Sequence, residues 1–452
     1  MGRLGVWLVA GLVVVGMVEA RLPAEGASGA EGMFDRFGGW RQTRTAGTGW
    51  FRTAIAEGRW WLVDPAGHRF LSVGVNNVNF RPDVIRGTDR SPYNETVKRE
   101  YRHESEWAQV AVRRLRGWGF NTVGAWSARV TWEQGMPYTV ILNCAGMVSW
   151  GEGKSFPDVF DPAFERAVAR YARRTCGPLA SDPELIGYFT DNELWWGHEE
   201  GGSETLLAEF LGREDSAPGR QALGWFLERR YLNIAELNEA WGTEYGSFAE
   251  VGRIPQVGSR IPGEDVVDFQ GLVAERYFRV THDAIREVDE HHLMLGCRFA
   301  GDAPRAVLEA MGPHADVVSL NHYDVHPPTE MLREIHRVTG LPVMVTEFSF
   351  RARESGLPNT RGAGIVVDTQ EERATHFERY VGELMELPMV VGYHWFEHSD
   401  QPAEGRFDGE DSNYGVVDIR DEPYTALVEV MERVNCSVYD LATKQARAGE
   451  GG

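Results

Sequence analysis

Short apolar runs alternate with amphipathic stretches along most of this chain. The runs are rich in Val, Ile, Leu and aromatic residues and show little polar alternation, which is typical of parallel strands covered on both faces. The eight runs are 71–78, 121–126, 138–143, 185–191, 293–298, 317–322, 343–347 and 390–396. Helical patterns lie between them, so the sequence predicts an α/β fold, a (β/α)8 TIM barrel.

The amphipathic stretches predict the helices of this barrel. They are 106–118, 163–175, 266–291 and 371–385. Asp161 followed by Pro162 is typical of a helix start, with a capping side chain and then proline at the first helical position. Residues 198–265 form a helical insertion between the fourth and fifth strands, with patterns at 204–211 and 217–241. We expect this insertion at the C-terminal face of the barrel, walling the active site.

The two ends of the chain differ from the barrel in pattern. Residues 21–47 are rich in Gly, Ala, Ser, Thr and Arg without an apolar period, and they predict a flexible linker. Residues 59–70 predict a hairpin that closes the bottom of the barrel. Residues 441–452 are polar and end in Gly-Gly, which predicts a disordered tail. The catalytic barrel is therefore expected to span 48–440.

The first twenty residues have the pattern of a secretory signal peptide. Arg3 precedes an apolar run over 4–18, and Val18-Glu19-Ala20 fits a cleavage site after Ala20. The run is short for a membrane span. We therefore expect a secreted or periplasmic protein without membrane association after signal cleavage; an uncleaved anchor is the alternative.

Composition narrows the possible partners. The net charge of −21 argues against nucleic acid, because phosphate contacts need clustered Lys and Arg. It also disfavours strongly polyanionic substrates, although local patches can override the net field. The fifteen tryptophans favour a large aromatic core and, more weakly, a sugar binder. The oligomeric state stays open.

Four cysteines lie far apart, at Cys144, Cys176, Cys297 and Cys436. Their spacing does not match zinc ligands, and three disulfide connectivities stay open. His322 and His326 are four residues apart, but the strand context and the following Pro327-Pro328 remove the helix that a metal-binding pair would need. The sequence predicts neither a metal nor a cofactor.

Two glutamates end predicted strands. Glu193 ends the fourth strand and Glu347 the seventh. Side chains at these ends point into the mouth of a TIM barrel, and these two strands lie across its axis from each other. A retaining glycosidase needs such a pair, one carboxyl as acid/base and one as nucleophile. Asn192 would then hydrogen-bond the sugar 2-hydroxyl. An unpaired charge is costly after a buried strand, which favours a functional role over a structural one.

These motifs resemble those of known enzymes. Asp191-Asn192-Glu193 and Thr346-Glu347 resemble the paired motifs of clan A glycoside hydrolases. The wider chain, about residues 48–435, resembles the catalytic domain of family 50 β-agarases and more distantly family 42 β-galactosidases. Further segments carry this likeness, at 58–65, 235–243, 392–397 and 413–418.

The resemblance implies a role for each matching residue. Glu193 is the acid/base with Asn192 beside it, and Glu347 is the nucleophile. Tyr323 hydrogen-bonds this nucleophile, and Trp395 is the aromatic platform under the sugar. The implied function is that of a secreted retaining glycoside hydrolase acting on a neutral, β-linked, galactose-containing poly- or oligosaccharide, agarase-like. The alternatives are another β-glycan, such as mannan, glucan or plant galactan, or a non-catalytic carbohydrate-binding barrel.

Position alone suggests further sugar-binding residues at or just after strand ends. These are Asn77, Trp126, Trp195, His322, His394 and Glu397. Turn chemistry is an equally good explanation of Asn77, and core packing is as good for Trp126. The linkage and the choice between endo and exo action stay open.

Overall fold

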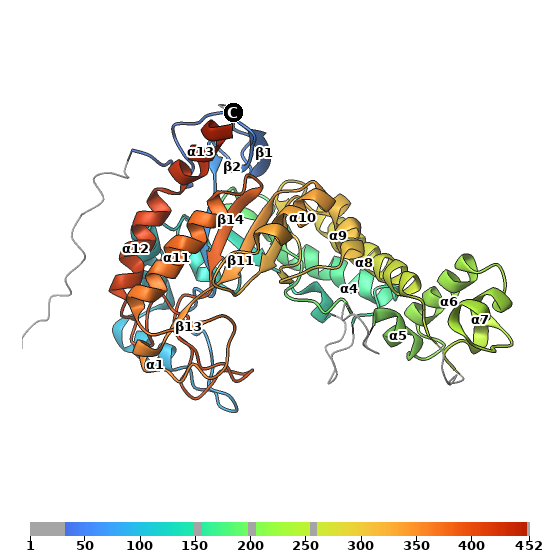
Figure 1. The fold of residues 1–452 in the computed structure, drawn as a ribbon. Helices are drawn as coiled ribbons and strands as arrows, with labels where there is room; N and C mark the ends of the chain where they lie inside the picture. The colour runs from blue at the N-terminus through green and yellow to red at the C-terminus, as the bar shows by residue number, and fades with distance from the viewer. Residues whose placement is uncertain (1–31, 148–155, 198–204, 254–259, 450–452) are drawn as a thin grey trace, which may run out of the picture.

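The structure is a computed structural model that describes residues 32–147, 156–197, 205–253 and 260–449. Figure 1 shows a curled sheet covered by helices, with one helical arm extending to the side. The predicted signal peptide over 1–20 lies outside the described residues. In the part that the structure describes, no helix is both long enough and apolar enough to cross a membrane.

The main sheet has nine strands in the order β8-β7-β6-β5-β4-β14-β11-β10-β9. They are Ser72–Val75 (β4), Thr122–Val123 (β5), Tyr138–Ile141 (β6), Leu185–Phe189 (β7), Leu293–Met294 (β8), Phe299–Ala300 (β9), Val318–Asn321 (β10), Val343–Phe348 (β11) and Val390–Trp395 (β14). All neighbouring pairs are parallel. Because β8 and β9 are parts of one segment, 293–300, the two ends of the order meet there. The sheet is that of an α/β barrel, as predicted.

Thirteen helices are found in the described residues. They are Pro92–Glu100 (α1), Glu104–Gly117 (α2), Arg129–Trp132 (α3), Pro162–Thr175 (α4), Leu206–Leu211 (α5), Pro218–Arg230 (α6), Ile234–Trp241 (α7), Gly263–Arg286 (α8), Arg305–Met311 (α9), Thr329–Thr339 (α10), Gln370–Met385 (α11), Thr425–Cys436 (α12) and Val438–Gly449 (α13). Asp161 caps α4, since its carboxylate accepts from the Ala163 N–H at 2.7 Å. The four predicted barrel helices correspond to α2, α4, α8 and α11.

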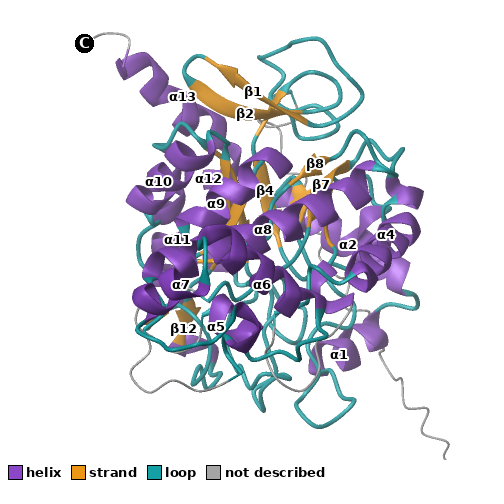
Figure 2. Cartoon of the chain, turned by 90° about the vertical axis from the view of Figure 1, so that its right-hand side faces the viewer, coloured by secondary structure: helices purple, strands orange, loops and turns teal. Residues whose placement is uncertain are grey.

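Helices α5, α6 and α7 follow β7 in the chain and precede α8. In Figure 1 they lie at the outer end of α8, away from the sheet, and Figure 2 shows them projecting toward the viewer. Phe210 of α5 packs edge-on against Phe269 of α8, with ring centroids 5.4 Å apart. We call α5, α6 and α7 the helical arm.

The N-terminal end of the barrel is closed by a hairpin. Its strands are Arg52–Ala56 (β1), Arg59–Val63 (β2) and Arg69–Phe70 (β3). Arg59 donates to the carbonyls of Met385 and Val390 at 2.9 and 3.0 Å, at the start of β14. Leu62 and Phe70 join the apolar cluster inside the barrel. Figure 2 shows this hairpin at one end and the long loops at the other, so we name these the closed and open ends.

The second half of the predicted linker is part of the fold. Phe37 and Trp40 are 3% and 8% exposed, and Trp40 stacks on Tyr439 with ring centroids 5.5 Å apart. The Trp40 N–H donates to the Arg69 carbonyl at 2.8 Å, which fixes this segment to β3. Residues 32–47 are therefore not a flexible linker. Aromatic residues spaced by three, from Phe34 onward, were the overlooked signal.

The predicted tail is also corrected. Helix α13 continues through position 441 to Gly449, and its first turns bury Val438, Tyr439 and Ala442 against the closed end. The Tyr439 hydroxyl donates to the Gly38 carbonyl at 3.1 Å. Helix α13 has only one short apolar stripe, so its sequence is mostly polar. This composition explains the wrong prediction of a disordered tail. In this structure all four cysteines are free thiols.

Candidate active site

A cavity of about 560 Å³ lies at the open end, where the barrel strands finish. Its lining residues are Asn77, Asp83, Trp126, Asn192, Glu193, Tyr323, Glu347, Ala363, Phe396, Arg406, Phe407, Asp408 and Glu410. Both predicted glutamates are among them, and so are four other predicted site residues. None of the described residues of the insertion, 205–253 and 260–265, lines the cavity, so this part of the insertion does not wall it as expected.

Glu347, in β11, is held at both carboxylate oxygens. Oε1 accepts from the Arg298 guanidinium at 2.7 Å, and Oε2 accepts from the Tyr323 hydroxyl at 2.6 Å. Burial and the neighbouring carboxylate raise the pKa of Tyr323 well above its usual value, so this phenol stays a donor. The carboxylate of Glu347 is therefore fixed in orientation by two hydrogen bonds.

Glu193 follows β7 and opens into the cavity. Its Oε1 accepts from the Asn321 amide at 2.9 Å, and its backbone N–H donates to the Arg298 carbonyl at 3.0 Å. Desolvation by the cavity walls raises the pKa of Glu193, and the charge of Glu347 raises it further. A carboxyl in this environment keeps its proton to a higher pH than an ordinary glutamate.

Arg298 and Asn321 connect the two glutamates, and sequence reasoning did not select either of them. Arg298 is fully buried and donates to Glu347 and to the Asn192 Oδ1, both at 2.7 Å. Asn321 donates to Glu193 and to the same Asn192 oxygen, at 2.9 and 3.1 Å. Arg298 ends the predicted strand 293–298 and Asn321 is the second-last residue of 317–322, so polar residues near strand ends were the signal that could have found them.

Five successive strand segments end on a non-glycine residue with positive φ. The residues are Asn77, Trp126, Asn143, Glu193 and Arg298, with φ between 49° and 67°. This left-handed region is uncommon for side chains with a Cβ, and such residues concentrate at functional sites. Here it turns the backbone at the open end immediately after each strand.

Asp191 anchors the segment that carries Asn192 and Glu193. Its Oδ2 accepts from the Ala145 N–H at 2.9 Å and from the hydroxyl of Tyr277 on α8. Burial raises the pKa of Asp191 to about 7, although these hydrogen bonds oppose the rise. The acidic residue of the Asp-Asn-Glu motif is thus a structural tie and does not line the cavity.

The other predicted sugar contacts are divided between cavity and core. Asn77 and Trp126 line the cavity, whereas Trp195 packs half-buried against the core. His322 is half-buried beside the Tyr380 hydroxyl, 3.2 Å from its Nδ1. His394 is fully buried inside the barrel with Nε2 2.8 Å from Ser72 Oγ. Burial lowers the pKa of His394 to about 3, so its ring is neutral.

Phe396 lines the cavity, whereas Trp395 does not. Trp395 is fully buried, donates from Nε1 to the Tyr414 carbonyl at 2.9 Å, and packs edge-on against Phe348 and Phe377. Neighbouring side chains on a strand point to opposite faces. Trp395 therefore does not line the cavity as predicted, whereas the next residue, Phe396, does.

One side of the cavity is acidic. Arg406 pairs with Glu410, Asp408 and Asp83 at 2.7, 2.9 and 3.8 Å. Behind them Glu397 is fully buried and accepts from the Asn77 amide and from Gln401, so it supports the wall without lining it. Burial raises the pKa of Glu397 well above its usual value. Phe407, at the rim, is 74% exposed.

Comparison with known proteins places this geometry among sugar-cleaving enzymes. A glycoside hydrolase family 42 model, described as β-galactosidase, matches residues 139–345. β-Agarase A of Vibrio sp. (strain JT0107) is 30% identical over 87% of this chain and 47% of its own length. β-Agarase B of the same strain is 27% identical over 90% of this chain and 50% of its own. The chain thus spans about half the length of these relatives.

Solved structures of agarases match this structure over most of the chain. The crystal structure of an agarase is 28% identical, with a TM-score of 0.81 over 91% of this chain and 68% of that one. An exo-β-agarase structure has the same TM-score and coverage at 25% identity. The barrel is thus a glycoside hydrolase domain, homologous to the family 50 β-agarases and more distantly related to the family 42 β-galactosidases, as the sequence motifs predicted.

Proposed function

We propose that this chain is a secreted retaining glycoside hydrolase that cleaves β-linked, galactose-containing poly- or oligosaccharides of the agarose type. The observation that carries the proposal is the pair Glu193 and Glu347 in one cavity, connected through Arg298, Asn192 and Asn321. The similarity to agarases supports the substrate class. The signal-like first twenty residues support export.

Glu347 acts as the nucleophile in the first step. Its carboxylate attacks the anomeric carbon, forming a glycosyl ester while the bond from that carbon to the leaving oxygen breaks. Arg298 and Tyr323 orient the attacking carboxylate through hydrogen bonds of 2.7 and 2.6 Å. This orientation supplies a near-attack geometry and lowers the entropic part of the barrier.

Glu193 supplies and then removes the proton. Its raised pKa keeps it protonated until it donates to the leaving oxygen. In the second step the Glu193 carboxylate takes a proton from water, the water oxygen attacks the anomeric carbon, and Glu347 is released. The configuration of the anomeric carbon is retained because it is inverted twice.

Asn192 and the cavity walls position the sugar. Since the Asn192 Oδ1 accepts from Arg298 and Asn321, its Nδ2 group serves the sugar 2-hydroxyl. Phe396 and Trp126 offer apolar faces to the sugar ring. The acidic side, with Arg406 held by three carboxylates, disfavours sulfated and carboxylated glycans and favours neutral ones.

The proposal is tested by digesting a panel of agarose, agaro-oligosaccharides, galactan, mannan and glucan. Reducing-sugar release from an agarose substrate, with the β-anomer formed first by NMR, is expected for wild type. Glu347→Gln should be inactive and Glu371→Gln, an exposed α11 variant, fully active. Release of the α-anomer would contradict the retaining mechanism. Binding without turnover on every substrate would favour the non-catalytic alternative.

A further inference from the structure

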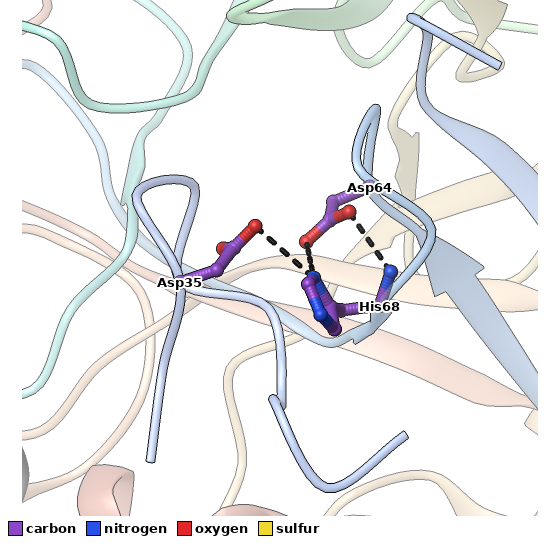
Figure 3. Close-up of side chains that lie close together, drawn as sticks. All are labelled: Asp35, Asp64 and His68. Carbon is purple, nitrogen blue, oxygen red and sulfur yellow. Dashed lines mark hydrogen bonds and ion pairs between the residues drawn. The ribbon is translucent and has the colours of Figure 1, made fainter. Parts of the chain in front are cut away.

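Three side chains with metal-ligating atoms converge at the closed end of the barrel, opposite the cavity. Asp35 comes from the segment 32–47, and Asp64 and His68 flank the turn between β2 and β3 (Figure 3). One potential ligand atom from each residue lies within 4.8 Å of the other two. Such a group can stabilise the fold through hydrogen bonds alone, or it can bind a metal ion. The other hydrogen bonds of these three side chains distinguish the two possibilities.

Each carboxylate uses one oxygen to hold its own turn. Asp64 Oδ1 accepts from the backbone N–H groups of residues 66–68 at 2.8 to 3.0 Å. Asp35 Oδ1 accepts from the N–H groups of Phe37 and Gly39 at 2.8 and 2.9 Å. Both carboxylates are therefore fixed before any ligand binds, with Oδ2 as the second oxygen of each. In metal sites, ligating carboxylates are commonly supported by hydrogen bonds of this kind.

The second oxygen of Asp64 has no hydrogen-bond partner among the described residues, and the Asp64 side chain is fully buried. His68 Nδ1 lies 3.7 Å from this oxygen and is hydrogen-bonded to Asp35 Oδ2 at 3.2 Å. Within the described parts of the chain, His68 is the sole ion-pair partner of these two carboxylates. A buried unpaired oxygen and an excess of negative charge are both costly, and a bound cation removes both costs.

The distances fit a small divalent ion. Zinc bonds of about 2.0–2.2 Å place neighbouring ligand atoms of a tetrahedral site roughly 3.3–3.6 Å apart. The separations of 3.2 and 3.7 Å from His68 Nδ1 bracket this range. One imidazole and two carboxylate oxygens suit zinc better than calcium, which takes six to eight oxygen ligands. Asp35 and His68 keep 10% and 13% of their side-chain surface exposed, so water can reach a fourth position.

We propose that Asp35, Asp64 and His68 bind one divalent metal ion of the zinc type. The ion ties the segment that precedes the barrel to the hairpin that closes it. Gly39 completes the enclosure, because a Cβ at this position would lie 1.9 Å from Asp64 Oδ2. The site stabilises the fold and takes no part in the reaction at the open end.

The test uses the full chain, treated with a chelator, dialysed and then supplied with Zn²⁺. Metal analysis after a second dialysis should find about one zinc per chain, and the Tm should rise by about 2 °C or more. Asp64→Asn keeps the Oδ1 acceptor for the turn but removes the anionic ligand, so it should lose the zinc and the Tm response. Asp283→Asn is the matched control, since it alters an exposed aspartate–histidine pair, 2.9 Å apart, and should leave both readouts unchanged.

Two results would overturn the proposal. One is a wild-type chain that retains no zinc and shows no Tm response. The other is equal zinc retention by wild type, Asp64→Asn and His68→Asn. If the Asp64 variant fails to fold, the His68 variant and the zinc dependence of the wild-type Tm still decide the question. Neither readout depends on a glycan substrate, so the outcome is separate from that of the proposed enzymatic function.

Discussion

The open and closed ends of the barrel both bring carboxylates together, but they hold them differently. At the open end, Glu193 and Glu347 accept from side chains that lie at or just beyond the ends of other strands, namely Asn321, Arg298 and Tyr323. At the closed end, the carboxylates accept mainly from the backbone of their own turns. Side-chain donors tune orientation and protonation, whereas backbone donors fix a shape. The contrast distinguishes the proposed reactive end from the structural end.

The largest effect is expected at Glu347. Glu347→Gln keeps the size of the side chain but removes the carboxylate that we propose as the nucleophile, so kcat/KM should fall by at least about 10⁴-fold. The measurement is reducing-sugar release from agaro-oligosaccharides, with circular dichroism to verify folding. If more than a tenth of the activity survived, the open end would lose its role as the reactive end.

Arg298 is buried and donates to Glu347, so in the proposed mechanism it orients the nucleophile as well as stabilising the fold. Arg298→Met leaves Glu347 Oε1 without its donor and should cost about 3–5 kcal/mol of stability. Activity should fall about 10²–10³-fold. Arg173→Met, which breaks an exposed pair with Glu287 at 2.8 Å, should cost less than about 1 kcal/mol. Equal effects of the two variants on unfolding would contradict this reading.

A substitution at Trp40 tests how much the closed end contributes to stability, separately from the cavity. Trp40→Ala removes a buried ring that stacks on Tyr439, so the free energy of unfolding should fall by about 3–5 kcal/mol. Below the lowered Tm, kcat/KM should match wild type because the cavity is at the opposite end. A large change in kcat/KM under those conditions would show that the two ends are coupled.

The pH profile tests the tuning of Glu193. Its pKa is raised, so the protonated acid is present at low pH and is lost as pH rises through that pKa. The alkaline limb of kcat/KM should therefore lie above the usual pKa of glutamate. The bond from Asn321 favours the charged form and lowers this pKa, so Asn321→Ala should move the limb to higher pH. A move to lower pH would contradict the assignment of Glu193 as the acid.

The smallest effect is expected at the rim. Phe407 is 74% exposed, so Phe407→Ala should change stability by less than about 0.5 kcal/mol. Loss of this aromatic face should raise KM for long substrates by about 2- to 10-fold and leave KM for short substrates unchanged. Trp225→Ala is the matched control, because this tryptophan is 55% exposed on the helical arm, outside the cavity. Equal KM changes for the two variants would exclude a specific role for Phe407.

The barrel strands and the glutamate pair were accessible from sequence because parallel strands covered on both faces leave unbroken apolar runs. The hydrogen bonds from Arg298 and Asn321 were not, since they depend on which strands are neighbours. Trp395 was assigned from the family resemblance, and a resemblance does not reveal that its side chain is buried while Phe396 lines the cavity.

The chain ends were misassigned for a related reason. Segment 32–47 and helix α13 each carry few apolar residues, and these become buried only when the two segments meet at the closed end. Short apolar patterns of this kind do not show whether a segment is buried until the residues that pack against it are known. The local sequence of each segment, taken alone, resembles that of solvent-exposed chain.

The left-handed turns after five successive strands limit which residues around the cavity can be substituted. Asparagine and glycine adopt such backbone at low cost, whereas β-branched residues do not. Asn77, Trp126 and Glu193 can therefore exchange with few other residues, whatever the substrate requires. The cavity residues between 396 and 410 are outside the left-handed set. A library that seeks a new glycan preference should vary this loop first and leave the strand ends unchanged.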